Sequence, residues 1–441
     1  MSDWRGRRVA VWGAARSGVA VANLLADLGA SVVLSDNRED LDVGGLDPRV
    51  ELRGGGNVLA GAEVLVPSPG IRPSTPVLRE AVATGVRLMG EVELAASVAT
   101  APIVAIGGTD GKSTTTEMIA ACLRAAGRDV VVAGNIGDPL SARARDVGPD
   151  GVLVAEISAF QTWSCHRFPA QVAVLTNIAE DHADYFDGDF ERYARAKLQL
   201  LDGLPPGGTA ILRAEDGRVG PARLPHGVRR VPFAIHPMLR GFGVRGGQLT
   251  VDDRPVMPTA DLPVPGRHNQ ANALAALAAG RAMGASIGAM LSGLRAYRGL
   301  PHRMEPVRVR RGVQWFNDSK GTNPHAAGSG LRALSGVKVI IAGGYEKGIS
   351  LDPYVDALDD VRHMVVTGQT ARRLMDLLAV RRPELPVERV PDMAAAVERV
   401  AEIARPGEKA ILSPAASSFD VYRGFDERGD VFKALVRALP D

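Results

Sequence analysis

Short apolar runs alternate with alanine- and leucine-rich stretches along almost all of this chain, and 50 glycines and 29 prolines separate them. Such alternation is typical of βαβ units, which build mostly parallel sheets covered by helices. The chain has 441 residues, which is more than the roughly 250–300 at which a single hydrophobic core stops growing. We therefore expect an α/β protein with two or three domains.

The periodic segments group into three blocks, which we expect to be domains: 1–98, 99–300 and 301–441. Ala101-Pro102 and Leu300-Pro301 mark the two boundaries, because the residue before a proline is disfavoured in a helix. Residues 205–265 are rich in Gly, Pro and Arg, and we expect an irregular, partly antiparallel section there. Strands are expected at 8–12, 31–35, 64–66, 103–106, 129–133, 152–157, 171–175, 313–317, 337–341, 363–366 and 409–412, and helices at 18–28, 117–126 and 190–201.

Composition excludes several classes of protein. Apolar residues make up 46% and charged residues 23%, which rules out wholesale disorder. Lys+Arg (52) nearly balances Asp+Glu (50), so charge favours neither nucleic-acid binding nor attachment to a membrane surface. The two cysteines, Cys122 and Cys165, are expected to be buried small residues in a reducing compartment. With no signal-peptide pattern and no apolar run near 18 residues, we expect a cytoplasmic protein that does not insert into a membrane.

The strongest local signal is the segment 103–116, IVAIGGTDGKSTTT, in which an apolar strand leads through a glycine loop into a helical pattern. Such a loop directs backbone N–H groups at phosphates, while Lys112 neutralises phosphate charge and the Ser113 hydroxyl reaches Mg²⁺. The usual spacing would put glycine at 106, but the chain has Ile106 and then Gly107. This shortened phosphate loop argues against the common GTPase and motor families.

A second glycine loop, Gly13 to Gly18, follows the first expected strand, and Asp36 ends the next one. The pattern is similar to the dinucleotide fingerprint GxGxxG, but Ala15 occupies the position of the middle glycine and would hinder close approach of a pyrophosphate. A different nucleotide ligand is therefore favoured, and a dinucleotide or a purely structural turn remain alternatives. The segment 66–71, VPSPGI, follows a strand where open sheets bind ligands.

Three polar side chains that follow the phosphate loop in the sequence are candidates for the same site. Glu156 ends an apolar strand, His182 follows another, and Lys197 lies in a helical stretch. A carboxylate and an imidazole at strand ends suit coordination of a hard cation. From spacing alone, Glu156 could equally be a solvated strand end, and Lys197 is better explained as a solvated surface lysine.

Taken in order, the motifs resemble those of the Mur ligase family of peptidoglycan synthesis, most closely its D-glutamate-adding members, over essentially the whole chain. The motifs are GTDGKSTT (108–115), GNIG (134–137), EISAFQ (156–161), TNIAEDH (176–182), YARAKLQL (193–200), GRHNQANALAAL (266–277), GLPHRME (299–305), NDSKGTN (317–323), GGYEKG (343–348), LSPAASSFD (412–420) and FDERG (425–429). The resemblance implies three α/β domains: a Rossmann-like N-terminal domain for the UDP substrate, a central phosphate-loop domain for ATP, and a Rossmann-like C-terminal domain for closure and the incoming amino acid.

The resemblance also implies a role for individual residues. ATP-binding positions are Gly108, Thr109, Asp110, Gly111, Lys112, Ser113, Thr114, Asn269, Asn272, Arg303 and Asp318. Positions for the UDP substrate are Arg16, Ser17, Asp36, Arg38, Ser68, Gly70, Asn135, Ser158 and Gln161. Positions for glutamate are Thr322, Lys347, Ser418 and Phe425. Catalytic positions are Lys112, Glu156, His182, Lys197, His302 and Lys320, and metal positions are Ser113, Glu156, His182 and Lys197.

The implied activity is ATP-dependent addition of D-glutamate to UDP-N-acetylmuramoyl-L-alanine through an acyl phosphate, by a monomer with two Mg²⁺ sites and a carbamylated Lys197. Three positions depart from the family pattern: Asp110 replaces an asparagine, Ala159 replaces a serine, and Tyr345-Glu346-Lys347 replaces Asp-Gly-Lys or Asp-Arg. A folylpolyglutamate-synthase-like ligase would share the short loop, but gives no reason for the first block. An NTP-driven switch would need no amino-acid pocket, and a dehydrogenase has no use for Gly-Lys-Ser.

Overall fold

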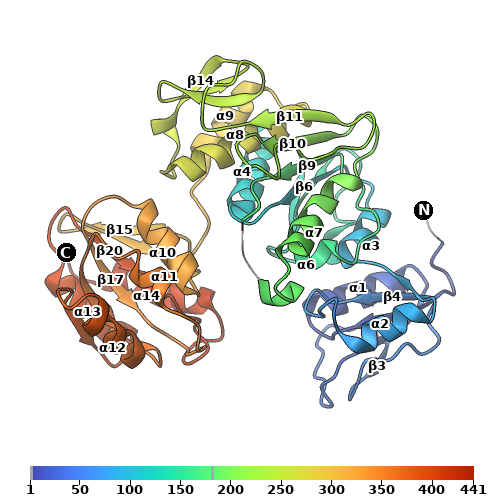
Figure 1. Ribbon diagram of the computed structural model, residues 1–441, viewed down its shortest axis with the longest axis horizontal. Coiled ribbons are helices and arrows are strands. Elements are labelled where there is room, and N and C mark those ends of the chain that lie inside the picture. The colour runs from blue at the N-terminus through green and yellow to red at the C-terminus, as the bar shows by residue number, and fades with distance from the viewer. Residues whose placement is uncertain (1–2, 180–182) are drawn as a thin grey trace. The chain divides into compact units, whose positions relative to one another are not determined.

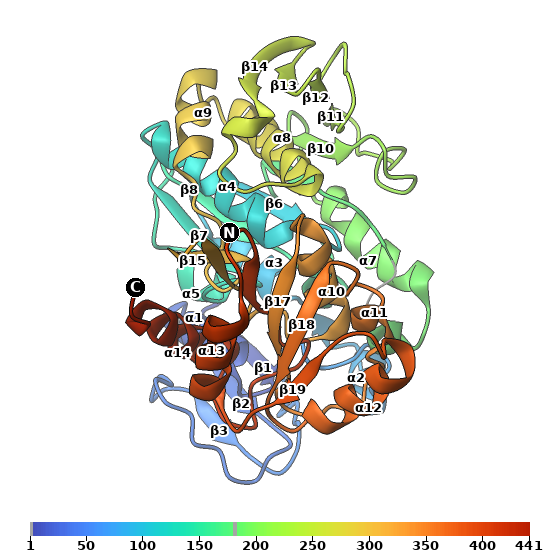
Figure 2. The same cartoon turned by 90° about the vertical axis from the view of Figure 1, so that its left-hand side faces the viewer.

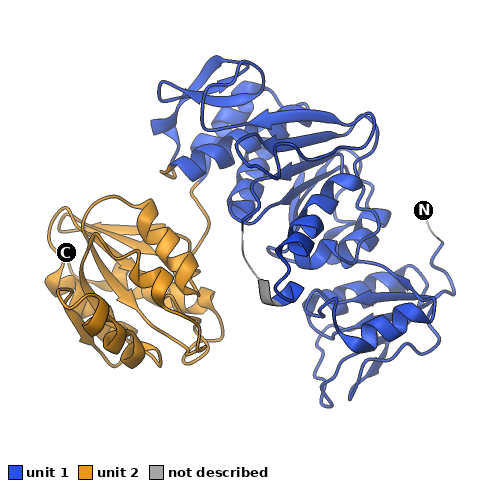
Figure 3. Ribbon diagram, viewed as in Figure 1, with its two compact units in different colours: residues 1–263, 267–297 blue, residues 264–266, 298–441 orange. Residues whose placement is uncertain are grey.

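The computed structural model describes residues 3–179 and 183–441. The fold contains three sheets, each flanked by helices, so the expectation of three α/β domains is confirmed (Figure 1). Contacts divide the chain into two compact units (Figure 3). Unit 1 comprises residues 1–263 and 267–297 and holds the first two sheets, and unit 2 comprises residues 264–266 and 298–441 and holds the third.

The first sheet has five parallel strands in the order β3-β2-β1-β4-β5. Its strands are β1 (Arg8–Trp12), β2 (Ser31–Ser35), β3 (Glu51–Arg53), β4 (Val64–Pro67) and β5 (Arg87–Leu88), and its helices are α1 (Arg16–Asp27), α2 (Pro76–Ala83) and α3 (Glu91–Val98). Trp12, Leu34 and Leu65 are fully buried, because helices cover a parallel sheet on both faces.

The second sheet has nine strands in the order β14-β13-β12-β11-β10-β9-β6-β8-β7. Its strands are β6 (Ile103–Gly107), β7 (Val130–Gly134), β8 (Val152–Glu156), β9 (Val172–Leu175), β10 (Thr209–Arg213), β11 (Arg229–Phe233), β12 (Phe242–Arg245), β13 (Gln248–Val251) and β14 (Arg254–Pro258). Its helices are α4 (Lys112–Ala125), α5 (Leu140–Arg143), α6 (Ala159–Thr162), α7 (Phe190–Asp202), α8 (Arg267–Ala282) and α9 (Ile287–Ala296), with short 3₁₀ turns at Ala183–Phe186 and Thr259–Asp261.

Residues 205–265 are more regular than expected. β10 pairs in parallel with β9 and β11, and only β12, β13 and β14 form antiparallel pairs. Pro255 lies on the edge strand β14, and Arg229 and Pro232 lie on β11, which pairs with β12 only at Phe233, so these residues occupy positions open on one side, where proline and charged residues are tolerated. They interrupt the apolar pattern from which strands are predicted.

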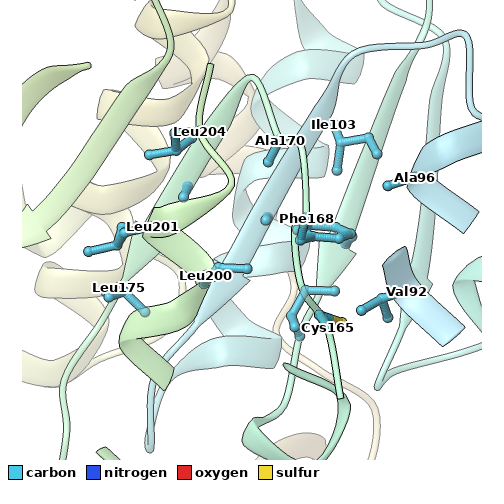
Figure 4. Packing of buried hydrophobic residues seen from close by; sticks show 14 of the residues in the cluster. Val92, Ala96, Ile103, Cys165, Phe168, Ala170, Leu175, Leu200, Leu201 and Leu204 are labelled. Atoms are coloured by element: carbon cyan, nitrogen blue, oxygen red, sulfur yellow. The ribbon is translucent and has the colours of Figure 1, made fainter. Parts of the chain in front are cut away.

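One apolar cluster fills the space between the second sheet and its helices (Figure 4). Val92 and Ala96 of α3 pack in it with Ile103 of β6 and with Phe168, so residues on both sides of the expected boundary near residue 98 share one core. Both cysteines are buried and unpaired, as predicted, and burial raises the pKa of the Cys122 thiol to about 12.

The third sheet has the order β15-β16-β20-β17-β18-β19, and all its pairs are parallel except β15 with β16. Figure 2 labels its strands β15, β17, β18 and β19. Its strands are β15 (Glu305–Arg310), β16 (Val313–Asn317), β17 (Lys338–Ala342), β18 (Val361–Val366), β19 (Val387–Arg389) and β20 (Lys409–Leu412). Helices α10 (Pro324–Ala333), α11 (Asp352–Val355) and α12 (Ala371–Arg381) cover one face, and α13 (Met393–Ile403) and α14 (Phe425–Ala438) cover the other. Ile340 and Val339 therefore face different cores.

None of the helices in the described part of the chain is both long enough and apolar enough to cross a bilayer.

The contact between α9 and α4 depends on a glycine. A Cβ atom on Gly293 would lie 2.5 Å from the Ala121 carbonyl oxygen and 2.8 Å from the Cys122 Cα, both backbone atoms of α4. Gly288, on the same helix α9, has no atom within 4 Å of its Cβ position.

We predict that Gly293→Ala lowers the free energy of unfolding by about 1–3 kcal/mol, because α9 must move away from α4. Gly288→Ala is the matched control, and it should leave stability unchanged or raise it by up to about 1 kcal/mol, since alanine is the better helix former. Urea unfolding of the two variants measures this difference. Equal stabilities would contradict the close approach of the two helices.

Candidate active site

The phosphate loop connects the buried strand β6 to α4, as the sequence predicts. Gly108 has a φ of +133°, and a Cβ there would lie 1.9 Å from the Thr176 hydroxyl oxygen, so only glycine fits. The Lys112 Nζ donates to the Thr109 carbonyl oxygen at 2.8 Å, which folds the lysine back over the loop. The first backbone N–H groups of α4 have no acceptor within the helix, so this end of α4 suits a phosphate.

Hydrogen bonds attach the loop to the segment that follows β9. Thr109 N donates to the Asn177 carbonyl oxygen at 2.9 Å, and Asp110 N donates to Asn177 Oδ1 at 3.0 Å. In return, Asn177 Nδ2 and the Thr176 hydroxyl donate to the Asp110 carbonyl oxygen at 3.0 and 2.6 Å. Only the backbone of Asp110 makes these bonds and its side chain is exposed, so the replacement of asparagine by Asp110 leaves the loop anchored.

Two asparagines of α8 extend this arrangement along α4. Thr115 Oγ1 donates to Asn272 Oδ1 at 3.2 Å, and Asn272 Nδ2 donates to Asn269 Oδ1 at 3.2 Å. α8 thus brings Asn269 and Asn272 beside the first turns of α4, which also carry Ser113 and Thr114. Residues separated by more than 150 positions in sequence therefore meet at one phosphate loop.

Lys197 on α7 is buried, with 5% of its surface exposed, so the alternative of a solvated surface lysine is wrong. Its amine donates to the Gly108 carbonyl oxygen at 2.5 Å and lies 4.5 Å from the ring centroid of Tyr193, one helical turn earlier. The Tyr193 hydroxyl is in turn 3.2 Å from Thr109 Oγ1. α7 therefore contacts the phosphate loop through both side chains.

Glu156 is likewise buried, with 2% exposed, and is not a solvated strand end. Its Oε1 accepts a hydrogen bond from Asn135 Nδ2 at 2.8 Å, whereas Oε2 has no hydrogen-bond partner among the described residues. β8 pairs with β6 so that Glu156 is opposite Ile106, immediately before the phosphate loop. An unpaired buried carboxylate oxygen is unfavourable unless a cation or a donor satisfies it, so this donor fits a hard cation such as Mg²⁺.

His182, the other expected protein ligand, lies outside the described residues. Within the part of the chain that the structure describes, no three His, Cys, Asp or Glu side chains come together as metal ligands.

In the first sheet, Asp36, Arg38 and Ser68 meet around the Gly13–Gly18 loop. Asp36 accepts hydrogen bonds from Ala14 N at 2.8 Å and from Arg38 Nε at 3.0 Å, and Arg38 holds the pKa of this carboxyl at about 2. The Ser68 hydroxyl donates to the Gly13 carbonyl oxygen at 3.0 Å. One Asp36 oxygen is thus bonded by the loop and the other by Arg38, which argues against a role for Asp36 as a free acceptor for the ribose of a dinucleotide.

Other candidate residues for the UDP substrate lie at or near the carboxyl ends of strands. Arg16, at the start of α1, donates to the Gly137 carbonyl oxygen at 2.8 Å, which joins the glycine loop to the GNIG segment. Ser17 follows it on α1, and Gly70 lies in the exposed turn after β4. At the start of α6, Gln161 Oε1 accepts hydrogen bonds from the Ser158 backbone N–H at 3.0 Å and from the Ser158 hydroxyl at 2.9 Å.

Unit 2 carries the remaining candidates. Asp318 directly follows β16 and is buried. Its Oδ1 accepts a hydrogen bond from Met304 N at 3.1 Å, whereas its Oδ2 has no hydrogen-bond partner among the described residues. Burial raises the pKa of Asp318 to about 7. Arg303, the other ATP candidate in this unit, is exposed. His302 is buried at a φ of +62°, and burial, reinforced by the positive charge of Lys433, lowers its pKa.

The proton position on His302 follows from its neighbours. Asn317 Oδ1 accepts a hydrogen bond from Ser319 N at 3.0 Å, so the Asn317 amide must present its Nδ2 donor to His302 Nδ1, 3.1 Å away. Nδ1 is then the acceptor, and the neutral ring carries its proton on Nε2. His302 is thus arranged to donate a hydrogen bond through Nε2 rather than to accept a proton there.

The glutamate candidates lie around the same edge of the third sheet. The Phe425 ring is edge-on to His302 with 5.9 Å between centroids, and the Lys320 amine lies 5.4 Å from the Phe425 ring centroid. Thr322 N donates to the Lys320 carbonyl oxygen at 2.8 Å. Lys347 is exposed on the turn after β17, and Ser418 is buried after β20.

Arg428 on α14 is a residue that sequence reasoning missed. It is 2% exposed and donates to Ser319 Oγ at 3.0 Å, to the Ser319 carbonyl oxygen at 2.8 Å, and to the carbonyl oxygens of Ala416 and Ser417 at 3.0 and 3.1 Å. Burial lowers its pKa to about 10. Arg428 thereby joins the segments that carry Lys320 and Ser418. The only sequence feature that pointed to Arg428 was the FDERG motif that contains it, since an arginine on an amphipathic helix is normally solvated.

Three family models match successive parts of this chain. Residues 7–90 match the MurD-like N-terminal domain of Mur ligases, residues 106–280 the Mur ligase middle domain, and residues 302–416 the Mur ligase glutamate ligase domain. The UDP-N-acetylmuramoylalanine–D-glutamate ligase of Caldanaerobacter subterraneus subsp. tengcongensis is 36% identical over 98% of both chains. The enzyme of the same name from Pelotomaculum thermopropionicum is 38% identical over 100% of this chain and 99% of its own.

Solved structures show the same fold at low sequence identity. The UDP-N-acetylmuramate–alanine ligase MurC of Thermotoga maritima superposes with a TM-score of 0.62 at 17% identity, over 98% of this chain and 99% of its own. The MurF ligase of the same organism, solved in complex with ADP, gives a TM-score of 0.58 at 16% identity over 99% of both chains. The two D-glutamate ligases match this chain along nearly its full length at 36% and 38% identity, so this chain belongs to the Mur ligase family.

Proposed function

We propose that this chain is an ATP-dependent ligase that joins D-glutamate to UDP-N-acetylmuramoyl-L-alanine in the synthesis of peptidoglycan precursors. The observation that carries this function is the phosphate loop with the buried Lys197 and Glu156 beside it, in a chain collinear with D-glutamate ligases at 36–38% identity. Phosphoryl transfer needs positioned phosphates and neutralised charge more than it needs a covalent intermediate on the enzyme. Lys112 and the first turn of α4 supply both.

The reaction proceeds in two steps that leave no group on the protein. A carboxylate oxygen of the L-alanyl end of the substrate attacks the γ-phosphorus of ATP, and ADP leaves with the electron pair of the broken P–O bond. The glutamate amine then attacks the acyl phosphate carbonyl, loses a proton, and inorganic phosphate leaves. His302 holds its proton on Nε2, which supports an orienting role for this residue rather than the role of a base.

Magnesium, when bound, supplies positive charge that neutralises the phosphates during transfer. Its proposed ligands are Ser113, Glu156, His182 and a carbamylated Lys197, arranged as two sites. The unpaired, buried Oε2 of Glu156 supports this assignment. The proposed ligands of ATP or the reacting phosphate are Asn269, Asn272, Arg303, Asp318 and Lys320. The loops of the first sheet are proposed to bind the UDP substrate.

The function is tested by phosphate release with ATP, Mg²⁺ and UDP-N-acetylmuramoyl-L-alanine across a panel of D- and L-amino acids. We expect release with D-glutamate alone, and none from Lys112→Ala, because that variant cannot neutralise the phosphates. Calorimetry is the control: Lys112→Ala should bind the UDP substrate within a few-fold of the parent. Release without any amino acid, or most of the parent turnover in Lys112→Ala, would contradict the proposed ligase.

A second prediction concerns the carbamate. An ordinary lysine with a pKa near 10.4 is cationic and should repel Mg²⁺. Lys197 is buried beside the phosphate loop, and a neutral lysine amine there can add CO₂ to give a carbamate, an oxygen-donor anion, with loss of a proton. Lys197→Ala and Lys197→Arg should both lose nearly all ligation, and acetate should partly restore the alanine variant.

A readout independent of activity is the carbamate carbon itself. Protein equilibrated with ¹³C-bicarbonate should show a carbamate resonance in the carbon NMR spectrum, and this resonance should disappear in Lys197→Arg. Full activity of Lys197→Arg, or an identical spectrum for the parent and this variant, would refute the carbamate.

A further inference from the structure

The turn that carries Lys347 departs from the family pattern, and the structure shows what holds it. Before the lysine, Tyr345 N donates to the Ser417 carbonyl oxygen at 2.8 Å, and Gly344 N donates to Thr370 Oγ1 at 3.0 Å. These bonds fix the start of the turn to the segment after β20 and to the N-cap of α12. They leave the lysine itself, and the two residues after it, to be held by other groups.

Glu346 and Arg373 supply those groups. Glu346 Oε1 accepts from Gly348 N at 2.6 Å, which closes the backbone around Lys347. Glu346 Oε2 lies 3.1 Å from Arg373 Nε in an ion pair, and a terminal nitrogen of Arg373 donates to the Ile349 carbonyl oxygen at 2.7 Å. The Glu346 carboxylate and the Arg373 guanidinium therefore hold the residue before Lys347 and the two residues after it.

The pair also determines the charge of the turn. Glu346 precedes Lys347 directly, so its negative charge, if unpaired, would oppose the attraction of Lys347 for an anion. Arg373 neutralises this charge, and the three side chains together carry one net positive charge. A turn with one exposed lysine and no opposing charge suits a carboxylate.

We propose that the Glu346–Arg373 ion pair is a positioning device that sets the affinity for the incoming dicarboxylic amino acid, by holding the backbone of Lys347 and cancelling the charge of Glu346. Lys347 contacts glutamate only under the function proposed above, on which this inference rests. Neither member of the pair touches the reacting atoms, so both act through Lys347.

Arg373→Ala should raise the glutamate KM by roughly 3- to 10-fold, because it frees the backbone at Ile349 and leaves Glu346 unneutralised, while kcat and the ATP KM stay within about 2-fold. Arg373→Lys keeps the charge and should recover most of the parent KM. Glu346→Gln retains an acceptor for Gly348 N and should raise the KM less than Arg373→Ala does. The double variant should raise the KM less than Arg373→Ala alone, because it frees the backbone at Ile349 but leaves no unneutralised carboxylate beside Lys347.

Arg381→Ala is the matched control. Arg381 is on the same helix α12, its side chain is 43% exposed against 40% for Arg373, and it pairs with Asp352 and Asp356 at 2.7 and 2.8 Å. Its loss removes two ion pairs from α12, yet should leave the glutamate KM unchanged. Thermal unfolding of each variant shows whether unit 2 remains folded.

Lys347→Ala separates failure of this inference from failure of the proposed function. Losing a charge-assisted hydrogen bond costs about 1.5–3 kcal/mol, so this variant should raise the glutamate KM by roughly 10- to 150-fold. If it does, and folded Arg373→Ala behaves like Arg381→Ala, the positioning role is refuted and the glutamate pocket stands. An unchanged glutamate KM in Lys347→Ala would overturn the pocket and the positioning role together.

Discussion

The hydrogen bonds between the phosphate loop and its neighbouring elements are the constraint on which the rest of the candidate site depends. Asn177 and Thr176 bind the backbone of Asp110 from the end of β9, and Lys197 binds the Gly108 carbonyl oxygen from α7. A shortened loop has few residues with which to hold its own shape, so packed elements around it must do so. The first turn of α4 and the buried carboxylate of Glu156 thereby acquire fixed positions beside one loop.

In unit 2, the buried guanidinium of Arg428 holds loops that carry candidate site residues. Arg428 donates four hydrogen bonds to two segments that follow different strands, which fixes the segments bearing Lys320 and Ser418. Burying a guanidinium is costly unless its donors are satisfied, and the four acceptors satisfy them. In both units, therefore, a buried basic side chain on a helix, Lys197 or Arg428, helps to fix loops at the carboxyl ends of parallel strands.

Sequence patterns predict the central strands well, since parallel strands buried on both faces are continuously apolar. The expected strands at 31–35, 313–317 and 409–412 match β2, β16 and β20 residue for residue. The strand β15 was not predicted, because Arg308 and Arg310 leave no continuous apolar run in this edge strand, and a four-residue alternation is a weak signal. Of the site, Lys112 and Ser113 follow from a contiguous motif, whereas the burial of Lys197 and Arg428 depends on partners about 90 to 110 residues away, which no local pattern encodes.

The central claim, that the substrate carboxylate is activated as an acyl phosphate, can be tested by following oxygen. UDP-N-acetylmuramoyl-L-alanine labelled with ¹⁸O in its alanyl carboxylate is ligated to D-glutamate, and the released phosphate is analysed by mass spectrometry or phosphorus NMR. The mechanism predicts that each phosphate carries one oxygen from the substrate carboxylate. Phosphate that carries no oxygen from the substrate, and that takes up label when the reaction is run in ¹⁸O water, would mean that water attacks ATP. That result would contradict the acyl phosphate mechanism.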